Sequence, residues 1–437
     1  MRIRTLTLAF IVTAVCMTSC SGASKSTSES GMTAGTGMAG DGVVEKTLKL
    51  GSFNAIKSEA ITDIHFAQGA TRSVRVRATQ DALDRTDISV AQSTLTIKEK
   101  SGVGRWKGDS DRLKITLFVT APELKSLNNQ GIMNFDADRM NSTGTDIRNT
   151  GIMKMKVEDI HDRGGDGTRI ENKGQMKAVV RTVDARLLTL DNTGILAFDN
   201  TGIKGGLNLK NNGRMTFAGD VDGNTARVDN TGACEMKCKF ALSDGFSCMN
   251  NGQLKMTGDV KAAKADIQNT GMYDITGAFN VTDGYSCMNK GQLKVTGDVK
   301  ASVADIRNTG ICDMKSAFRL GSVYSYENKG RATNAGDIAA QSVRINNSGT
   351  DNRSGSMKAD KLSVEVNGHS QYDISYSGGD VGLNCKGLGE FRLALDCRSI
   401  DLNSGGRVNV TLTGTADKTS LYGSGISNVN TTGLNKF

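Results

Sequence analysis

Histidine and acidic side chains are the first to inspect for catalysis, because most hydrolytic and proton-transfer chemistry depends on them. The three histidines, His65, His161 and His369, are far apart in the sequence. None belongs to an HExxH zinc motif or to a Ser-His-Asp order, and no phosphate-binding glycine loop is present. The sequence therefore predicts no catalytic residues, no metal-ligand set and no cofactor.

Residues 158–167 form an acidic, glycine-rich segment. Carboxylate oxygens are preferred ligands of Ca²⁺, so this segment could hold a calcium ion. Its spacing matches neither an EF-hand nor a nonapeptide calcium repeat. We therefore expect a solvated, protruding turn, with a calcium loop as the alternative.

The cysteines do not suggest a disulfide framework. Seven of the nine follow the N-terminal region, and an odd number pairs poorly. Cys248 and Cys287 fall in one predicted buried column about 10 Å apart, whereas a disulfide needs Cα atoms within about 6.8 Å. We interpret these residues as small core side chains with free thiols.

The element that positions all these residues is a repeat marked by Asn-x-Gly. Its asparagines are Asn129, Asn149, Asn172, Asn192, Asn211, Asn230, Asn250, Asn269, Asn289, Asn308, Asn328 and Asn347. Nearly every interval is 19 or 20 residues, and the interval from Asn149 to Asn172 is 23. A fixed period of this size indicates a solenoid, here of about fifteen to seventeen coils.

Each repeat alternates apolar and polar residues on both sides of the turn, which is typical of a strand with one buried face. Apolar residues stand two positions before the Asn and four and six positions after it, as Ile267, Tyr273 and Ile275 do around Asn269. The Asn is an even step from these columns. We therefore predict that its side chain points inward and forms a hydrogen-bonded ladder along the stack. We expect the Gly to supply a positive φ.

A slower period of 39 residues is superimposed, seen in Gly-Asp pairs at 219, 258, 297 and 336. Two coils therefore form one unit, with like residues about 10 Å apart. Five positions after the Asn, the charge alternates along Glu235, Lys255, Asp274, Lys294 and Asp313. We interpret this charge ladder as cross-strand stabilisation, with a ligand-binding stripe as the alternative.

The N-terminus is typical of an exported protein. Arg2 and Arg4 precede a short apolar run, which predicts a signal peptide over residues 1–19. The segment ending in Cys20 resembles the bacterial lipobox, which implies lipid attachment at Cys20; a plain signal peptide with an incidental cysteine is the alternative. Residues 20–42 are rich in Ser, Gly and Thr and are predicted to be a flexible tether.

The fold class follows from these patterns: all-β, a right-handed parallel β-helix (β-solenoid) over residues 127–437. The chain has 52 Gly, one Pro and one Trp, which suits many turns and small, stackable core residues. Residues 43–126 lack the Asn column but contain strand-like runs. Because a solenoid end is an open sheet edge, we predict that this section caps the stack.

Four N-terminal motifs resemble a known family. They are FNAI at 53–56, DIHFAQG at 63–69, LTI at 95–97 and VTAPELKSL at 119–127, followed by Gly131. Together they resemble the putative auto-transporter adhesin head (GIN) domain family. The resemblance implies a β-solenoid-like envelope protein of Bacteroidetes-type bacteria, often a lipoprotein. That family usually has Gly-Ser-Gly where this chain has Asn-x-Gly, and no functional residues carry over.

The leading hypothesis is a non-catalytic, adhesin-like binding or spacer module in a Gram-negative cell envelope, lipid-anchored to the outer membrane on its surface or periplasmic face. Expected partners are the membrane, through the lipid, and a glycan or an envelope or host protein. The alternatives are a polysaccharide lyase or hydrolase and a purely structural scaffold. The net charge of +8 is dispersed and aromatics are 5%, which argues against nucleic-acid binding. No oligomeric state is indicated.

Overall fold

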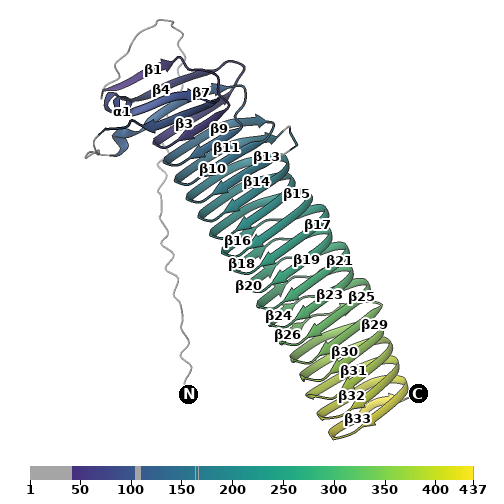
Figure 1. Cartoon of the computed structure of the whole chain (residues 1–437). Coiled ribbons are helices and arrows are strands. Elements are labelled where there is room, and N and C mark those ends of the chain that lie inside the picture. Colours follow the sequence, from purple (N-terminus) through teal and green to yellow (C-terminus); the bar gives the residue numbers. More distant parts are fainter. Residues whose placement is uncertain (1–41, 104–109, 163, 166, 437) are drawn as a thin grey trace, which may run out of the picture. The chain divides into compact units, whose positions relative to one another are not determined.

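The computed structural model describes residues 42–103, 110–162, 164–165 and 167–436. Within them, 78% of the residues are in strands and 2% in helices, and the strands form a β-solenoid of about 16 turns. Figure 1 shows how the strands stack along one axis. The all-β prediction is thereby confirmed, and so is the predicted coil count. The predicted signal peptide, Cys20 and the tether up to residue 41 lie outside the described residues. No helix in the described part of the chain is long and apolar enough to cross a membrane.

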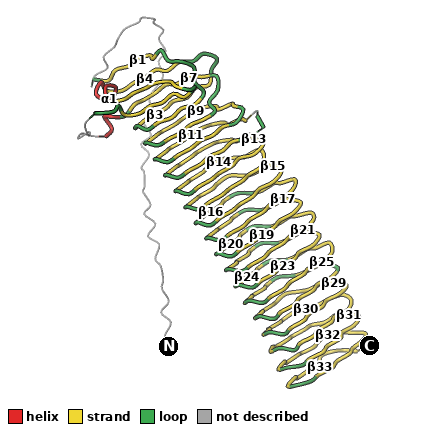
Figure 2. Tube along the Cα trace, viewed as in Figure 1, coloured by secondary structure: helices red, strands yellow, loops and turns green. Residues whose placement is uncertain are grey.

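Each coil contains a strand that ends on the Asn and a strand that begins just after the Gly, and the turns between them align along one edge of the stack (Figure 2). Coils pair with their neighbours in parallel, Asn opposite Asn. The strands of the first coils are β8 (Ser126–Asn129), β9 (Ile132–Ser142), β10 (Thr145–Asn149), β11 (Ile152–Asp162), β12 (Thr168–Asn172), β13 (Gln175–Asn192), β14 (Ile195–Asn211) and β15 (Arg214–Asn230).

In the middle of the stack, a second corner divides each coil into a short strand and a long one. In most of these coils a glycine with positive φ stands at this corner, such as Gly258 at +131° and Gly277 at +153°, whereas Cys238 and Ser316 stand there in two coils. The short strands are β16 (Ala233–Lys237), β18 (Gln253–Thr257), β20 (Met272–Thr276), β22 (Gln292–Thr296), β24 (Ile311–Lys315) and β26 (Arg331–Ala335). The long strands are β17 (Phe240–Asn250), β19 (Val260–Asn269), β21 (Phe279–Asn289), β23 (Val299–Asn308) and β25 (Phe318–Asn328).

The last coils are mostly single long strands. They are β27 (Ile338–Ala339), β28 (Ser342–Asn347), β29 (Thr350–Val366), β30 (His369–Cys385), β31 (Leu388–Ser404), β32 (Arg407–Gly423) and β33 (Ile426–Lys436). Here the column of inward Asn residues continues as Val366, Cys385 and Ser404, all of them fully buried.

The strands of the N-terminal section pair with the first coils of the stack, but not in chain order. Its elements are β1 (Val43–Leu48), β2 (Ala55–Ser58), β3 (Ile61–Gln68), β4 (Ser73–Thr79), α1 (Gln80–Arg85), β5 (Thr86–Ala91), β6 (Thr94–Glu99), a 3-10 turn (Ser110–Leu113) and β7 (Ile115–Ala121). β2 and β3 pair in parallel with β8 and β9 on one side and with β6 and β7 on the other. Antiparallel β4 and β5 then pair with β7 and β6, so the exposed parallel edge is covered.

The predicted Asn ladder is present. All twelve side chains are at most 1% exposed. Each Nδ2 group from Asn129 to Asn328 donates to the Oδ1 atom of the next Asn at 2.7–2.8 Å. Nδ2 also contacts the carbonyl oxygen of its own turn glycine, at 3.2 Å for Asn250. At Asn347 the ladder passes to the Ser370 hydroxyl at 2.8 Å.

The predicted reason for the turn glycine was wrong. None of the twelve glycines of Asn-x-Gly has a positive φ. Instead, the coils approach so closely that a Cβ atom on Gly271 would lie 2.0 Å from the carbonyl oxygen of Gly252. The Gly is therefore required by stacking rather than by backbone conformation. Only the late turn glycines Gly406 and Gly425 combine the turn with a positive φ, at +99° and +75°.

Replacing Asn250 by Ala is expected to lower the free energy of unfolding by about 1–3 kcal/mol. The change removes the bond to Asn269 and leaves the buried Oδ1 atom of Asn269 without its donor, while the Nδ2 group of Asn230 keeps the carbonyl oxygens of Gly232 and Gln253 as acceptors. Chemical unfolding followed by circular dichroism measures the effect. Asn251, which follows in the sequence but is exposed, is the matched control and should change stability by less than about 0.5 kcal/mol when replaced by Ala.

Candidate functional site

The histidines do not form a catalytic cluster. His65 Nδ1 lies 2.7 Å from a carboxylate oxygen of Asp136, and His161 Nδ1 lies 2.9 Å from one of Asp184. Both are surface pairs in which an acid of the adjacent coil meets one imidazole. Among the described residues, no three His, Cys, Asp or Glu side chains are grouped so that they could hold a metal ion.

The acidic segment 158–167 differs from the predicted protruding turn. Glu158 and Asp159 lie inside β11, and both pair with Arg181 of the next coil, at 2.9 and 2.8 Å. Asp162 is buried at the end of the strand and accepts a hydrogen bond from the backbone N–H of Gly164 at 2.8 Å. Two of the four acids are thus used in ion pairs between coils. Residues 163 and 166 lie outside the described part of the chain.

The seven cysteines of the solenoid are buried and free, in agreement with the interpretation as core residues. Burial raises the pKa of the Cys234, Cys248 and Cys312 thiols to about 12. Because the folded-state pKa lies above the unfolded value of 9.0, the stabilisation from burying a neutral thiol is complete below about pH 9. It is lost as the pH rises towards 12.

These thiols are therefore expected to resist alkylation in the folded protein. A pKa raised from 9.0 to about 12 lowers the thiolate fraction about a thousand-fold at pH 8, and thiolate is the reactive form. Titration with a thiol reagent should label none of the seven within the time that labels all seven in guanidinium chloride. Rapid labelling of Cys248 in the native state would contradict its placement.

The two-coil Gly-Asp repeat belongs to the second corner of the solenoid. Asp220, Asp259 and Asp337 each accept a hydrogen bond at 2.9 Å from a backbone N–H of the next coil. At Asp337 a hydrogen bond from the Ser356 hydroxyl, together with this backbone bond, holds the pKa of the carboxyl below its ordinary value. The repeat therefore fastens successive coils to one another at the corner.

A buried polar cluster interrupts the apolar columns near β29, and the sequence reading missed it. Asp351 is 0% exposed and Arg353 is 5% exposed, with Arg353 Nε 3.4 Å from Asp351 Oδ2. Asp351 also accepts hydrogen bonds from Asn334 Nδ2 and the Tyr372 hydroxyl, both at 2.7 Å. The guanidinium lies 4.5 Å from the ring centre of Tyr326. Charged residues four and six positions after Asn347 were the available signal.

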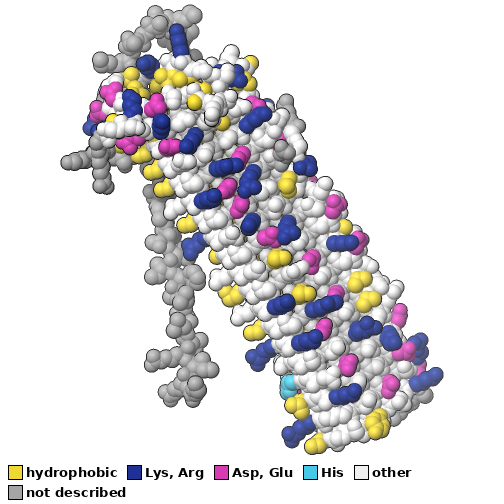
Figure 3. All heavy atoms as spheres, viewed as in Figure 1, with side chains coloured by type: hydrophobic (Ala, Val, Ile, Leu, Met, Phe, Trp, Pro, Cys, Tyr) yellow, Lys and Arg dark blue, Asp and Glu magenta, His cyan; other side chains and the backbone are white. Residues whose placement is uncertain are grey.

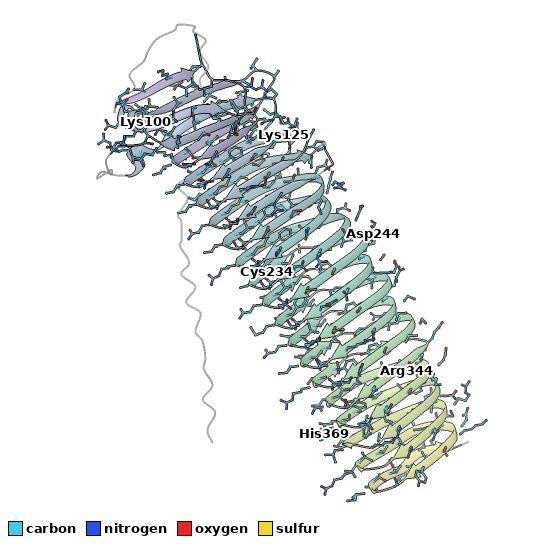
Figure 4. All side chains as sticks on the ribbon, in the orientation of Figure 1. Lys100, Lys125, Cys234, Asp244, Arg344 and His369 are labelled. Atoms are coloured by element: carbon cyan, nitrogen blue, oxygen red, sulfur yellow. The ribbon has the colours of Figure 1, made fainter. Side chains whose placement is uncertain are left out.

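The candidate site is the outer face of the short strands from β16 to β24. A shallow hollow of about 580 Å³ extends over these strands. Each strand presents three outward side chains, which are Gln253, Lys255 and Thr257 in β18 and Met272, Asp274 and Thr276 in β20. Lysines are exposed, and the acids between them are half-buried. Figure 4 labels Cys234, which lies under this face in β16.

The predicted charge ladder crosses this hollow, and its register is confirmed. Lys255 stands opposite Asp274, and Asp274 stands opposite Lys294. The expected ion pairs between these neighbours do not form within the described residues, and Glu235 pairs with Lys237 of its own strand at 3.3 Å. Elsewhere acids and bases are paired, as in Arg319–Asp298 at 2.9 Å. Charges of both signs are interspersed over the visible surface (Figure 3).

The hollow therefore contains polar groups that are still free to bind. Among the described contacts, the side chains of Gln253, Lys255, Gln292 and Lys294 have no hydrogen-bond or ion-pair partner. Two large apolar side chains alternate with them, Met272 at 45% exposure and Ile311 at 50%. Such a surface combines donors, acceptors and apolar contact area with no side chain arranged for proton transfer or nucleophilic attack.

One known family and several solved structures are similar to this chain. The family described as putative auto-transporter adhesin, head GIN domain, matches residues 52–381. A putative adhesin from Bacteroides fragilis is 12% identical; the match covers 54% of this chain and 97% of that one, with a TM-score of 0.38. A putative adhesin from Parabacteroides merdae is 14% identical over 68% and 97% of the chains, with a TM-score of 0.30.

A putative lipid binding protein from Parabacteroides distasonis is 12% identical over 90% of this chain and 98% of that one, with a TM-score of 0.18. No curated protein matches the chain.

Proposed function

We propose that this chain, which belongs to the family described as putative auto-transporter adhesin, head GIN domain, is a non-catalytic binding module of the bacterial cell envelope. The observation that carries the proposal is the hollow over β16–β24, where a regular array of polar groups is left without partners. On a solenoid, such an array extends in one direction only, so it suits an extended partner rather than a compact small molecule.

Anchoring through Cys20 is part of the same proposal. A diacylglyceryl group on Cys20 would hold the protein at the outer membrane, since each buried methylene contributes about 0.8 kcal/mol. The segment 20–42 would then connect the anchor to β1. Mass spectrometry of the membrane-extracted protein should show an acylated N-terminal cysteine; a Cys20→Ala variant should then be released into the soluble fraction.

A glycan-cleaving enzyme fits the hollow less well. Such enzymes generally need two carboxyl groups about 5–9.5 Å apart around the scissile bond. In the hollow, Asp274 and Asp313 are two coils apart, about 10 Å, with Lys294 between them. An assay for reducing ends, made after polysaccharides are incubated with the protein, distinguishes a binding module from a glycan-cleaving enzyme. A binding module releases no new reducing ends.

Binding of the purified protein to isolated bacterial envelopes and to host-cell surfaces tests the proposal. The variant Lys255→Gln/Lys294→Gln, which removes both lysines of the hollow, should lose most of the binding. The matched control is Lys261→Gln/Lys300→Gln, which changes two lysines at the same spacing on β19 and β23. Equal and undetectable binding by all three proteins would favour the purely structural scaffold.

A further inference from the structure

Outward side chains in the hollow repeat every second coil. β18 and β22 present the same three residues, Gln, Lys and Thr, at 253, 255 and 257 and again at 292, 294 and 296. Between and beyond them, β20 and β24 present a large apolar residue followed by an aspartate, Met272 with Asp274 and Ile311 with Asp313. The hollow is thus a periodic surface with two kinds of row.

This period discriminates between classes of extended ligand. Adjacent strands lie about 4.8 Å apart, so like rows recur after about 10 Å. An extended peptide presents side chains on one face every 6.8 Å or so, and it falls out of register after one repeat. An α-helix would need a continuous apolar stripe, which Gln253 and Gln292 interrupt. A linear polysaccharide built of disaccharide units repeats over about the same 10 Å as two coils.

The charges select the kind of polysaccharide. Lys255 and Lys294 are exposed and have no acidic partner, whereas Asp274 and Asp313 are half-buried between and beside them. An approaching chain therefore meets one free ammonium group per two coils. The recessed carboxylates can accept hydrogen bonds from hydroxyl or amide N–H groups of the intervening sugar, because ionised carboxylates are acceptors only. A polysaccharide with one anionic group per disaccharide would place one negative charge opposite each of these lysines.

We propose that the hollow binds a linear acidic polysaccharide with one negative charge per disaccharide, lying along the stack across β18, β20, β22 and β24. This inference rests on the proposed binding function. The ammonium groups of Lys255 and Lys294 contact successive anionic groups, and the amides of Gln253 and Gln292 hydrogen-bond beside them. Met272 and Ile311 pack against the C–H faces of the alternate sugars.

Length dependence follows from the same geometry. The strands from β16 to β24 cover four coil intervals, about 19 Å, which corresponds to about four sugars. Each row contributes little, so a single disaccharide should bind weakly. Affinity should rise in steps of two sugars, because each added unit reaches another lysine row without a new entropic cost of association.

Hyaluronan oligosaccharides of two, four, six and eight sugars are the test probe, because they alternate a uronic acid with an N-acetylated amino sugar. Isothermal titration with the purified protein should show at least ten-fold tighter binding of the tetrasaccharide than of the disaccharide, and little gain beyond six sugars. Cellotetraose has the same spacing and no charge, and it should bind at least ten-fold more weakly than the hyaluronan tetrasaccharide.

Amino-acid substitutions test whether the lysines of the hollow contribute to the binding affinity. Lys255→Gln/Lys294→Gln should weaken hyaluronan binding at least ten-fold, because it removes both ammonium groups that contact the anionic groups. The control Lys261→Gln/Lys300→Gln should bind as the unchanged protein does. Circular dichroism confirms that each variant is folded, so that lost binding is not lost structure.

The outcomes separate this inference from the broader function. No length-dependent binding of hyaluronan overturns the polysaccharide assignment. If envelope or cell binding then persists, depends on Lys255 and Lys294, and disappears after protease treatment of the cells, the hollow binds a protein and the proposed function stands. If neither cells nor oligosaccharides bind, both proposals fail.

Discussion

Replacing Asp351 by Ala is expected to lower the free energy of unfolding by about 3–5 kcal/mol, the range found when a buried ion pair loses one partner. Arg353 would remain in the core with its charge uncompensated. The donors on Asn334 and Tyr372 would lose their acceptor as well. Urea unfolding followed by circular dichroism measures the loss, and amide exchange in β28–β30 locates it.

Asp373 provides the matched control for this experiment. It is an exposed aspartate in the next coil, one residue after Tyr372. Its replacement by Ala should change stability by less than about 0.5 kcal/mol. A loss below about 1 kcal/mol for Asp351→Ala would contradict the buried, charged environment described here.

Replacing Gly271 by Ala is the second change with a large expected effect, a loss of about 3 kcal/mol. The new Cβ atom would lie 2.0 Å from the carbonyl oxygen of Gly252, so the two coils would have to separate. Separation would also break the 2.8 Å hydrogen bond between Asn250 and Asn269. The unfolding midpoint in urea and local amide exchange in β19 and β20 report the effect.

Gly284, in strand β21 of the coil that begins after Gly271, is the control. A Cβ atom there would meet no atom within 4 Å, and its φ lies outside the left-handed region. Gly284→Ala should therefore be neutral or stabilise the protein by up to about 1 kcal/mol, because alanine restricts the unfolded chain. Equal behaviour of the two variants would show that stacking does not explain the turn glycine.

Periodicity determined most of the fold. The spacing from Asn129 to Asn347 predicted the coils, and the even step from Asn269 to Tyr273 and Ile275 placed the asparagines inside. This succeeded because a strand has a strict period of two, so one known face assigns all the others. The charge ladder was predicted in the correct register for the same reason.

Contacts between segments far apart in the sequence were not predictable in this way. The position of β2 and β3 between β8–β9 and β6–β7 has no local signature, because it depends on which strand edges meet. The glycines that follow Glu158 and Asp159 led to the prediction of a turn. In the structure both acids lie in a strand and pair with Arg181 of the next coil. The pairing of Asp351 with Arg353 likewise depends on Tyr372 and Asn334 from adjacent coils.

The same distinction between local pattern and tertiary contact applies to the residues of the candidate site. The absence of a catalytic motif and the inward Asn column could be inferred from residue type and spacing alone, because both are properties of the local chain. Which charges remain free was decided only by the tertiary structure. Glu235 pairs within its own strand, whereas Lys255 and Lys294 stay unpaired above a hollow. Whether a surface charge is satisfied depends on rotamers and neighbours in three dimensions, and the sequence pattern alone indicated only its column.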